Sequence, residues 1–249
     1  MNRCEDCKKE FPKEYVFCPL CGEAFVNEKS AQYWKQKGIE LRYEGKSSDA
    51  IEAYLKHNKL DDSNPYVWDD LGQLYYHMGE IDKSIESYKK AIELKDDFAD
   101  NYYYLGISYY RRALVEKANE AFKKCLDLNP ELMIAYYWLG LTYYHMGEQD
   151  KAIESYKKLL DFNPSSFIAN YHLGINYNSI HEYDKAIFHF KQLEECCSDS
   201  EAVLYHLGVA YFESGKLTES VETFNRALKL NPKDKRSKKM LEYVTGHRL

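Results

Sequence analysis

Four cysteines near the start of the chain have the residue type and spacing of a metal site. Cys4 and Cys7 form one Cys-x2-Cys pair, and Cys18 and Cys21 form a second pair after ten intervening residues. Thiolates bind Zn²⁺ well, and four of them complete a tetrahedral shell that leaves no position for water or substrate. The spacing therefore predicts one structural Zn²⁺ ion held by all four cysteines. A redox pair of disulfides is the alternative, which is disfavoured because no βαβ pattern surrounds either pair.

The segment that carries these cysteines, residues 1–28, is expected to form a small domain that depends on its metal. Phe11, Phe17 and Phe25 are the large apolar side chains available to cover the ion. A segment this short cannot bury enough surface to fold alone, so metal binding would supply its folding free energy. The pattern resembles the short zinc ribbons found at many prokaryotic N-termini, although Lys8 occupies a position where those ribbons usually have glycine.

The rest of the chain is organised by a strict internal repeat of 34 residues. Glycine recurs at this period without a slip, at Gly38, Gly72, Gly106, Gly140, Gly174 and Gly208. A leucine precedes this glycine in five of the six units, a small residue follows it after twelve positions, and an aromatic residue follows after sixteen. A second glycine lies seven positions after the first in four units. A period of this length indicates stacked supersecondary units.

Within each unit, the apolar spacing predicts two amphipathic helices joined by a short turn. A glycine inside a helix costs about 1 kcal/mol relative to alanine, so six in register require a reason. We expect close approach of the two helices, because the glycine carries no side chain and a small residue faces it. Asn-Pro steps such as Asn129-Pro130 end one helix and favour the start of the next.

These slots resemble the tetratricopeptide repeat (TPR) family in the early aromatic residue, the Leu-Gly step, the following tyrosine, the small residue, the second aromatic residue and the late proline. The resemblance implies an all-α fold, a right-handed superhelical solenoid of six helix–turn–helix repeats. The repeats would span residues 31–64, 65–98, 99–132, 133–166, 167–200 and 201–234. Residues 235–249 would form a C-terminal cap helix that shields the last repeat. Lys37, Ala113 and Asn170 depart from the pattern.

The resemblance also implies a binding surface, because the first helices of TPR units line a concave face. Three slots share one side of each first helix. From them we predict a partner-binding groove that comprises Tyr76, Tyr103, Ile107, Tyr110, Tyr137, Leu141, Tyr144, Tyr171, Ile175 and Tyr205. Tyrosine offers a large contact area with few rotatable bonds and a hydroxyl group for peptide backbone. We hypothesise that a peptide or amphipathic helix with apolar anchors binds there. Alternatively, these tyrosines pack against neighbouring repeats, or the ribbon or cap helix covers them.

Charge and motifs exclude several function classes. Residues 31–232 carry a net charge of −9, residues 1–30 carry −1 and residues 233–249 carry +4. Such an acidic body disfavours binding to a phosphate backbone. The chain has no phosphate loop, nucleophile elbow or HExxH motif, so no enzymatic activity and no small-molecule substrate are expected. His172 and His206 are interpreted as groove lining, and Cys125, Cys196 and Cys197 as buried or inert thiols.

The sequence thus favours a protein–protein interaction scaffold or adaptor with an unidentified protein or peptide partner. The zinc ribbon would serve as a second interaction module. The alternative is an accessory factor associated with nucleic acid in transcription or translation, which would use the ribbon and the basic C-terminal helix. No apolar run is long enough to cross a membrane and no apolar signal region follows Met1, so a cytoplasmic location is expected.

Overall fold

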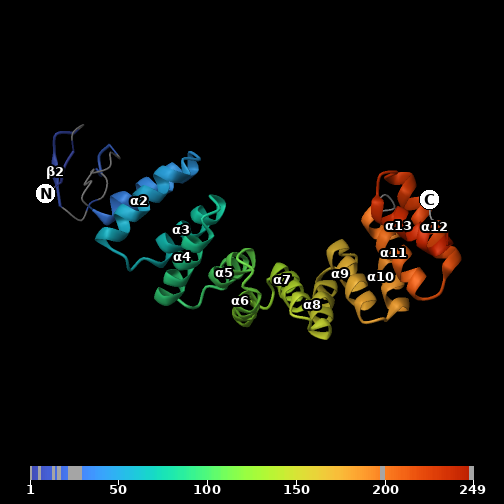
Figure 1. The fold of residues 1–249 in the computed structure, drawn as a ribbon. Helices are drawn as coiled ribbons and strands as arrows, with labels where there is room; N and C mark the ends of the chain where they lie inside the picture. Colours follow the sequence, from blue (N-terminus) through green and yellow to red (C-terminus); the bar gives the residue numbers. More distant parts are fainter. Residues whose placement is uncertain are drawn as a thin grey trace. The chain divides into compact units, whose positions relative to one another are not determined.

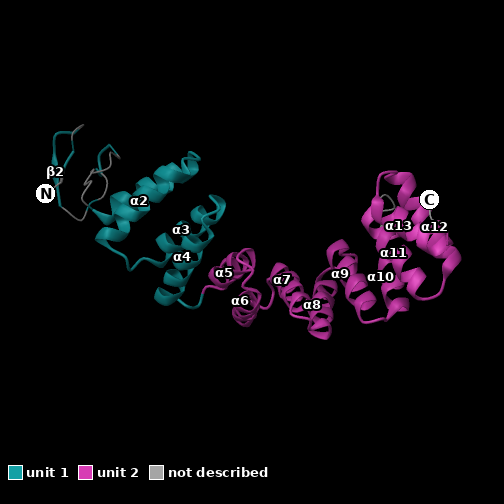
Figure 2. Ribbon diagram, viewed as in Figure 1, with its two compact units in different colours: residues 1–97 teal, residues 98–249 magenta. Residues whose placement is uncertain are grey.

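The structure is a computed structural model that describes residues 2–4, 7–12, 15, 18–21, 30–196 and 200–246. Figure 1 shows a chain built of helices, with two very short strands at its N-terminal end. Two compact units divide the chain, residues 1–97 and residues 98–249 (Figure 2).

The N-terminal strands form a small antiparallel hairpin. Strand β1 (Asn2–Arg3) pairs with β2 (Glu10–Phe11), with Asn2 opposite Phe11 and Arg3 opposite Glu10. Cys4 directly follows β1, and its backbone N–H donates a hydrogen bond to the carbonyl oxygen of Lys9. The hairpin therefore places the first cysteine pair in the loop between the two strands.

Helices occupy the remainder of both units and alternate in length between 13 and 14 residues up to α12. The first unit contains α1 (Ala31–Tyr43), α2 (Ser47–Leu60), α3 (Pro65–His77) and α4 (Ile81–Leu94). The second unit contains α5 (Ala99–Arg111), α6 (Val115–Leu128), α7 (Met133–His145), α8 (Gln149–Phe162), α9 (Phe167–Ser179), α10 (Tyr183–Cys196), α11 (Glu201–Glu213), α12 (Leu217–Leu230) and α13 (Lys235–Thr245). Consecutive odd- and even-numbered helices pack as hairpins, which confirms the predicted all-α repeat fold.

The two helices of each hairpin meet closely at the periodic glycine. A Cβ atom added at any of these six glycines would lie 2.5–2.8 Å from the aromatic ring sixteen residues later on the second helix. Gly140 faces Tyr156 in this way, and the Tyr156 ring is completely buried. Close approach of the helices, the predicted reason for the glycine period, is therefore confirmed, although the nearest atoms belong to an aromatic ring and not to the small residue predicted to face the glycine. The ring that fills the space is the second aromatic slot of the repeat.

The turn inside each hairpin adopts the same left-handed backbone conformation in all six units. Glycine occupies it in four units, and Ala113 (φ 56°) and His181 (φ 64°) adopt it in the other two. A side chain at positive φ is disfavoured by about 1–2 kcal/mol. The hairpin geometry thus overrides the local preference of Ala113 and His181.

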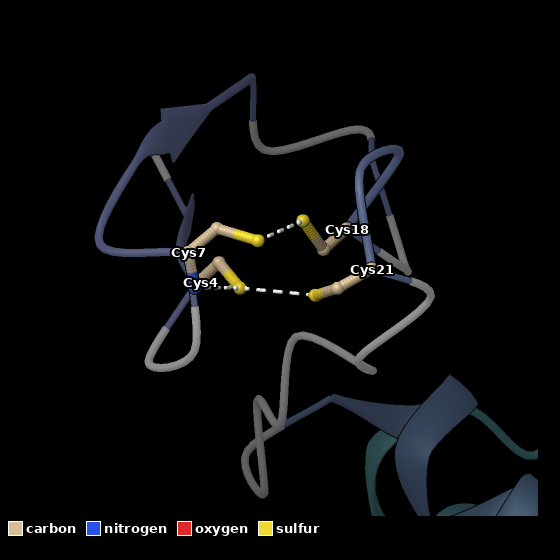
Figure 3. Close-up of side chains that lie close together, drawn as sticks. All are labelled: Cys4, Cys7, Cys18 and Cys21. Atoms are coloured by element: carbon tan, nitrogen blue, oxygen red, sulfur yellow. Dashed lines mark hydrogen bonds between the residues drawn. The ribbon is translucent and has the colours of Figure 1, made fainter.

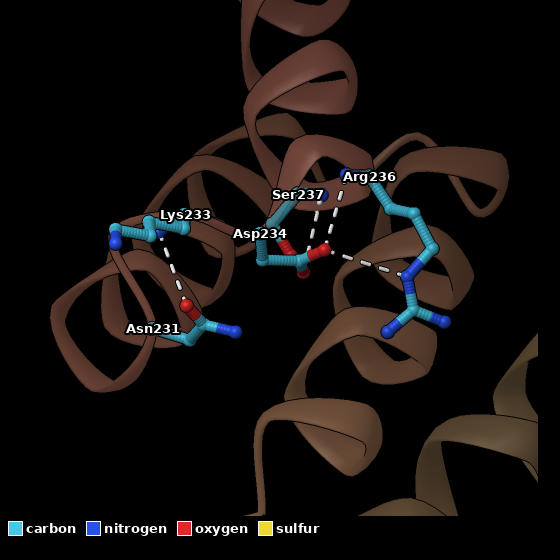
Figure 4. Close-up of polar contacts among 5 residues, drawn as sticks. All are labelled: Asn231, Lys233, Asp234, Arg236 and Ser237. Carbon is cyan, nitrogen blue, oxygen red and sulfur yellow. Dashed lines mark hydrogen bonds and ion pairs between the residues drawn. The ribbon is translucent and has the colours of Figure 1, made fainter.

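Helix α13 continues the repeat instead of merely following it. It begins at Lys235, one period after α11 begins at Glu201, and it packs against both α12 and α11. Asp234 caps its N-terminus by accepting hydrogen bonds from the backbone N–H groups of Arg236 and Ser237 (Figure 4). Gly246 ends it in the left-handed conformation. The expected cap helix is therefore the first helix of a seventh repeat that has no second helix within the described residues.

Candidate metal centre and partner-binding face

The four N-terminal cysteines converge on one point (Figure 3). All four Sγ atoms lie within 4.8 Å of one another, with 3.5 Å between Cys4 and Cys21 and 3.8 Å between Cys7 and Cys18. Four thiolates around Zn²⁺ at Zn–S distances of about 2.3 Å place their sulfur atoms about 3.8 Å apart. The observed cluster thus fits a tetrahedral ion of this size. These cysteines are free thiols, not disulfides.

Backbone N–H groups donate hydrogen bonds to two sulfur atoms of the cluster, those of Cys4 and Cys18. The backbone N–H of Cys7 donates a hydrogen bond to Cys4 Sγ over 3.2 Å. Burial would raise the pKa of the Cys18 thiol, but hydrogen bonds from the backbone of Leu20 and Cys21 outweigh it and lower that pKa to about 7. Such N–H groups stabilise the thiolate, which is the form that binds a metal ion.

Of the residues expected near the metal, the structure describes Lys8 and Phe11. Lys8 has φ 56°, a left-handed conformation that glycine adopts without strain. Phe11 is half-buried and its ring centroid lies 6.4 Å from that of Tyr15. Phe17 and Phe25 lie outside the described residues, as does Cys197. Cys125 is completely buried, and burial raises the pKa of its thiol to about 12, as expected for an inert thiol.

Most residues of the predicted groove lie on one row of helices in the second unit. The first helices of successive repeats contact each other directly, α5 with α7, α7 with α9, α9 with α11, and α11 with α13. We call the surface they share the tyrosine face, comprising Tyr103, Ile107, Tyr110, Tyr137, Leu141, Tyr144, Tyr171, Ile175 and Tyr205. Ile107 is buried, and the others are half-buried. Tyr76 belongs to α3 in the first unit, which is described separately.

A ladder of stacked rings joins the repeats beneath the tyrosine face. Trp138 stacks on Phe122, His172 on Tyr156, and His206 on Phe190, with interplanar angles of 13°, 17° and 15°. In each pair, the second aromatic slot of one repeat meets the sixth position of the next. His172 and His206 are therefore wedged between repeats, which corrects their interpretation as groove lining. Burial lowers the pKa of each imidazole to about 4, so both are neutral at pH 7.

The tyrosines of the face lean against this ladder. The Tyr137 ring meets His172 edge-on at 5.4 Å, and the Tyr171 ring meets His206 edge-on at 5.7 Å. The Tyr110 hydroxyl is 2.9 Å from His145 Nε2, which links α5 to α7. These contacts hold each ring in place against the ladder. The tyrosine residues themselves remain half-buried. The predicted alternative, packing of the tyrosines between repeats, thus holds for Tyr110, Tyr137 and Tyr171, while their role in partner binding stays a prediction.

The centre of the tyrosine face is apolar and carries no charge. Helices α7 and α9 contain no Asp, Glu, Lys or Arg. At their N-terminal ends, Met133 and Ile168 are 48% and 47% exposed, and Phe167 stacks on Tyr171 with ring centroids 6.0 Å apart. Met133 and Phe167 are not among the predicted groove residues, although both fall one turn before a predicted groove tyrosine.

The corresponding helices of the first unit are polar. Arg42 forms an ion pair with Asp70 and donates a hydrogen bond to Gln73 over 2.8 Å. The Tyr54 hydroxyl donates to Asp70 Oδ2 over 2.9 Å, so a carboxylate takes the place that an aromatic ring has in later repeats. Burial raises the pKa of the Asp70 carboxyl group. The uncharged character is therefore a property of α7 and α9 and not of every first helix.

Comparison with known protein families identifies the repeats. Models described as tetratricopeptide repeat match residues 100–131, 134–166 and 202–234, and a model described as TPR repeat matches residues 72–112. Together they span about half of the chain. No curated protein matches the sequence. Among the described residues, no helix is long and apolar enough to cross a membrane.

Many solved structures share the fold. YrrB, described as a TPR protein with an unusual peptide-binding site, has a TM-score of 0.69 and 20% identity over 76% of this chain and 98% of its own. MamA has a TM-score of 0.61 and 35% identity over 64% of this chain and 92% of its own. PilF of Pseudomonas aeruginosa has a TM-score of 0.66 and 16% identity over 87% of this chain and 98% of its own. The similarity to YrrB and PilF shows the fold alone.

Proposed function

The chain belongs to the tetratricopeptide repeat family, and from this premise we propose that it is a non-enzymatic scaffold that binds a protein partner on the tyrosine face. The partner would be a peptide or an amphipathic helix with apolar anchors. Family membership supports protein binding as the general role, and the peptide-binding site named for YrrB is one example within the same fold. The assignment to this particular surface rests on the chemistry of α7 and α9.

One observation carries this proposal: two adjacent first helices lack charge and still expose apolar side chains. Met133, Ile134 and Ile168 are each more than 40% exposed, although solvent-facing helix positions elsewhere in the chain are rich in Lys and Glu. Contiguous exposed apolar surface is uncommon on soluble proteins and marks interaction sites. Half-buried aromatic rings beside it match the composition of interface centres.

The test compares partner binding by variants of the tyrosine face and of another surface. Tyr137→Ala with Tyr171→Ala should remove partners that co-purify with the full chain and are quantified by mass spectrometry. Because both rings also contact the ladder, Met133→Glu with Ile168→Glu is the second variant, which changes only exposed positions. Phe188→Ala with Leu217→Ala, both exposed on second helices of the same unit, is the control. Unchanged partners in both test variants, with normal helical circular dichroism, would refute the proposal.

We also propose that the four cysteines hold one structural Zn²⁺ ion and that the ribbon provides a second interaction module. The sulfur positions support a tetrahedral ion, and four thiolates leave no coordination position for substrate. When bound, the ion would fix the loop after β1 against the loop that contains Cys18 and Cys21. A reducing location such as the cytoplasm would keep these thiols available for the metal.

A further inference from the structure

The tyrosine face ends at a helix that is strongly basic. Helix α13 carries Lys235, Arg236, Lys238 and Lys239 in its first five residues, with Glu242 as its single acidic residue. Residues 31–232 together carry a net charge of −9, whereas residues 233–249 carry +4. A strongly basic helix thus completes the row of first helices that includes the uncharged α7 and α9.

Contacts place one side of α13 beside the tyrosine face. The Arg236 guanidinium carbon lies 4.8 Å from the Tyr205 ring centroid, and the Tyr243 ring lies 5.5 Å from that of Phe212 on α11. Phe212 occupies the position in its repeat that Tyr144 occupies two repeats earlier. Lys239 lies three residues after Arg236 and four before Tyr243, so all three residues share one side of α13.

These cations have no anionic partner apart from Asp234. Lys235, Lys238 and Lys239 are exposed and form no ion pair with any residue that the structure describes. In contrast, the lysines in the first turns of the second helices pair with glutamates, as Lys83 does with Glu80 and Lys151 with Glu148. Cations near a helix N-terminus are also disfavoured by the helix dipole. The cluster of cations at this end of α13 therefore destabilises the unliganded helix. An external anion bound there would offset this destabilisation.

The tyrosine face itself offers hydrogen-bond donors without acceptors. No hydrogen bond of the Tyr137, Tyr144 or Tyr171 hydroxyl group is present within the described residues. Beneath them, the completely buried Tyr156 hydroxyl also has no partner. Burial raises the pKa of the Tyr137 and Tyr171 hydroxyls, which therefore remain protonated donors at pH 7. A partner that brings carboxylate or carbonyl oxygens complements such a surface.

We propose that the partner is an acidic peptide segment whose apolar anchors lie on α7 and α9 and whose carboxylates lie against Lys235, Arg236 and Lys239 of α13. This inference rests on the proposed function, and it adds the charge of the ligand and its placement along the face. A polyanionic nucleic acid is disfavoured because the basic cluster is small and adjoins a unit that is otherwise acidic. Charge pairs at the edge of an apolar contact mainly steer association and set specificity.

The test is panning of a random linear peptide library against the full zinc-loaded chain, followed by affinity measurement with synthetic copies of the selected peptides. The selected sequences should combine aromatic or aliphatic anchors with a cluster of Asp and Glu. Lys235→Glu with Lys239→Glu should weaken their binding about tenfold or more at low salt and reduce its salt dependence. Glutamate at position 235, in the first turn, favours α13, and unchanged helical circular dichroism of the variant would show that the loss does not come from unfolding. Lys124→Glu with Lys191→Glu, exposed on α6 and α10, is the charge-matched control and should change binding less than twofold.

The outcomes separate this inference from the proposed function. The selected peptides could lack an acidic bias, bind wild type and the Lys235/Lys239 variant equally, and lose binding in the Met133/Ile168 variant. That result would overturn the acidic ligand and leave the proposed function intact. A library from which nothing is enriched, or peptides indifferent to the Met133/Ile168 variant, would overturn both. A single-stranded oligothymidylate probe that binds through Lys235 and Lys239 and displaces the peptides would overturn the acidic peptide in favour of nucleic acid.

Discussion

The His172 imidazole lies stacked on the Tyr156 phenol ring of the preceding repeat, with ring centroids 5.0 Å apart and ring planes inclined by 17°. His206 repeats this arrangement on Phe190, at 5.9 Å. Both histidines connect one helical hairpin to the next. Protonating either would place a positive charge between aromatic rings in a site with little access to water.

The stability of the chain should therefore fall at mildly acidic pH. Burial lowers the pKa of His172 and His206 from 6.5 to about 4. Between these values the unfolded chain binds more protons, so this contribution is complete above pH 6.5 and is lost as the pH falls towards 4. The upper limit is about 3 kcal/mol per histidine. Denaturant unfolding at pH 7.5 and pH 4.5 would measure it.

The control for this pH dependence is His172→Phe with His206→Phe, which retains the stacked rings and removes both titrating groups. Because zinc release at low pH affects both proteins equally, the difference between them isolates the histidines. The variant should lose less stability than wild type between the two pH values. Equal losses in the two proteins would show that the stacked histidines do not contribute.

The close approach at the periodic glycines predicts an unusual response to alanine. Although alanine favours a helix by about 1 kcal/mol over glycine, Gly140→Ala should destabilise the chain by about 2 kcal/mol, because its Cβ would lie 2.8 Å from the Tyr156 ring. Thermal unfolding would measure the change. The double variant with Tyr156→Leu should lose less than the sum of the two single changes, since leucine leaves room for the methyl group. Additive effects would contradict the contact.

Metal content provides a third prediction. The full chain should bind one Zn²⁺ ion, as measured by native mass spectrometry and by colorimetric release. Cys18→Ser should abolish stoichiometric binding, because removing one of four ligands opens the shell. Cys125→Ser is the matched control, since this thiol is buried in α6, and it should leave the metal content unchanged. Full occupancy in the Cys18 variant would contradict the four-cysteine site.

The strained backbone at Lys8 predicts a stabilising substitution in the same segment. Lys8→Gly should slow zinc loss to a chelator about two- to tenfold, because glycine adopts φ 56° without the cost of a side chain, about 1 kcal/mol. Lys9→Gly, at a neighbouring exposed residue without positive φ, should speed the loss or leave it unchanged. If both glycine variants behave alike, the backbone at Lys8 is not strained.

The sequence was sufficient for the features that depend on spacing along one chain. The glycine period, the aromatic residue sixteen positions later and the two cysteine pairs all correspond to contacts in the structure. The role of His172 was beyond this reasoning, because its stacking partner Tyr156 belongs to the preceding repeat. The same slot holds Asp70 in the second repeat, where it accepts a hydrogen bond from a tyrosine. Spacing gives the side of a helix, whereas the ring met across a repeat boundary depends on packing.

The extent of the tyrosine face was underestimated for a related reason. Met133 and Phe167 are the first residues of their helices. From the sequence, an apolar residue at that position can belong either to the helical period or to the end of the preceding loop. The structure shows that Phe167 stacks on Tyr171 and thereby belongs with the face. Helix ends are the positions at which periodicity carries the least information.

The separation of charge between α7 and α8 has a consequence for how such arrays diversify. Helix α7 carries no charged residue, while its hairpin partner α8 carries six. Solubility is thus supplied by one helix and surface chemistry by the other. Substitutions in the first helices can therefore alter ligand preference with little effect on solubility, and first helices exchanged between repeats would retarget the array while its outer helices stay constant.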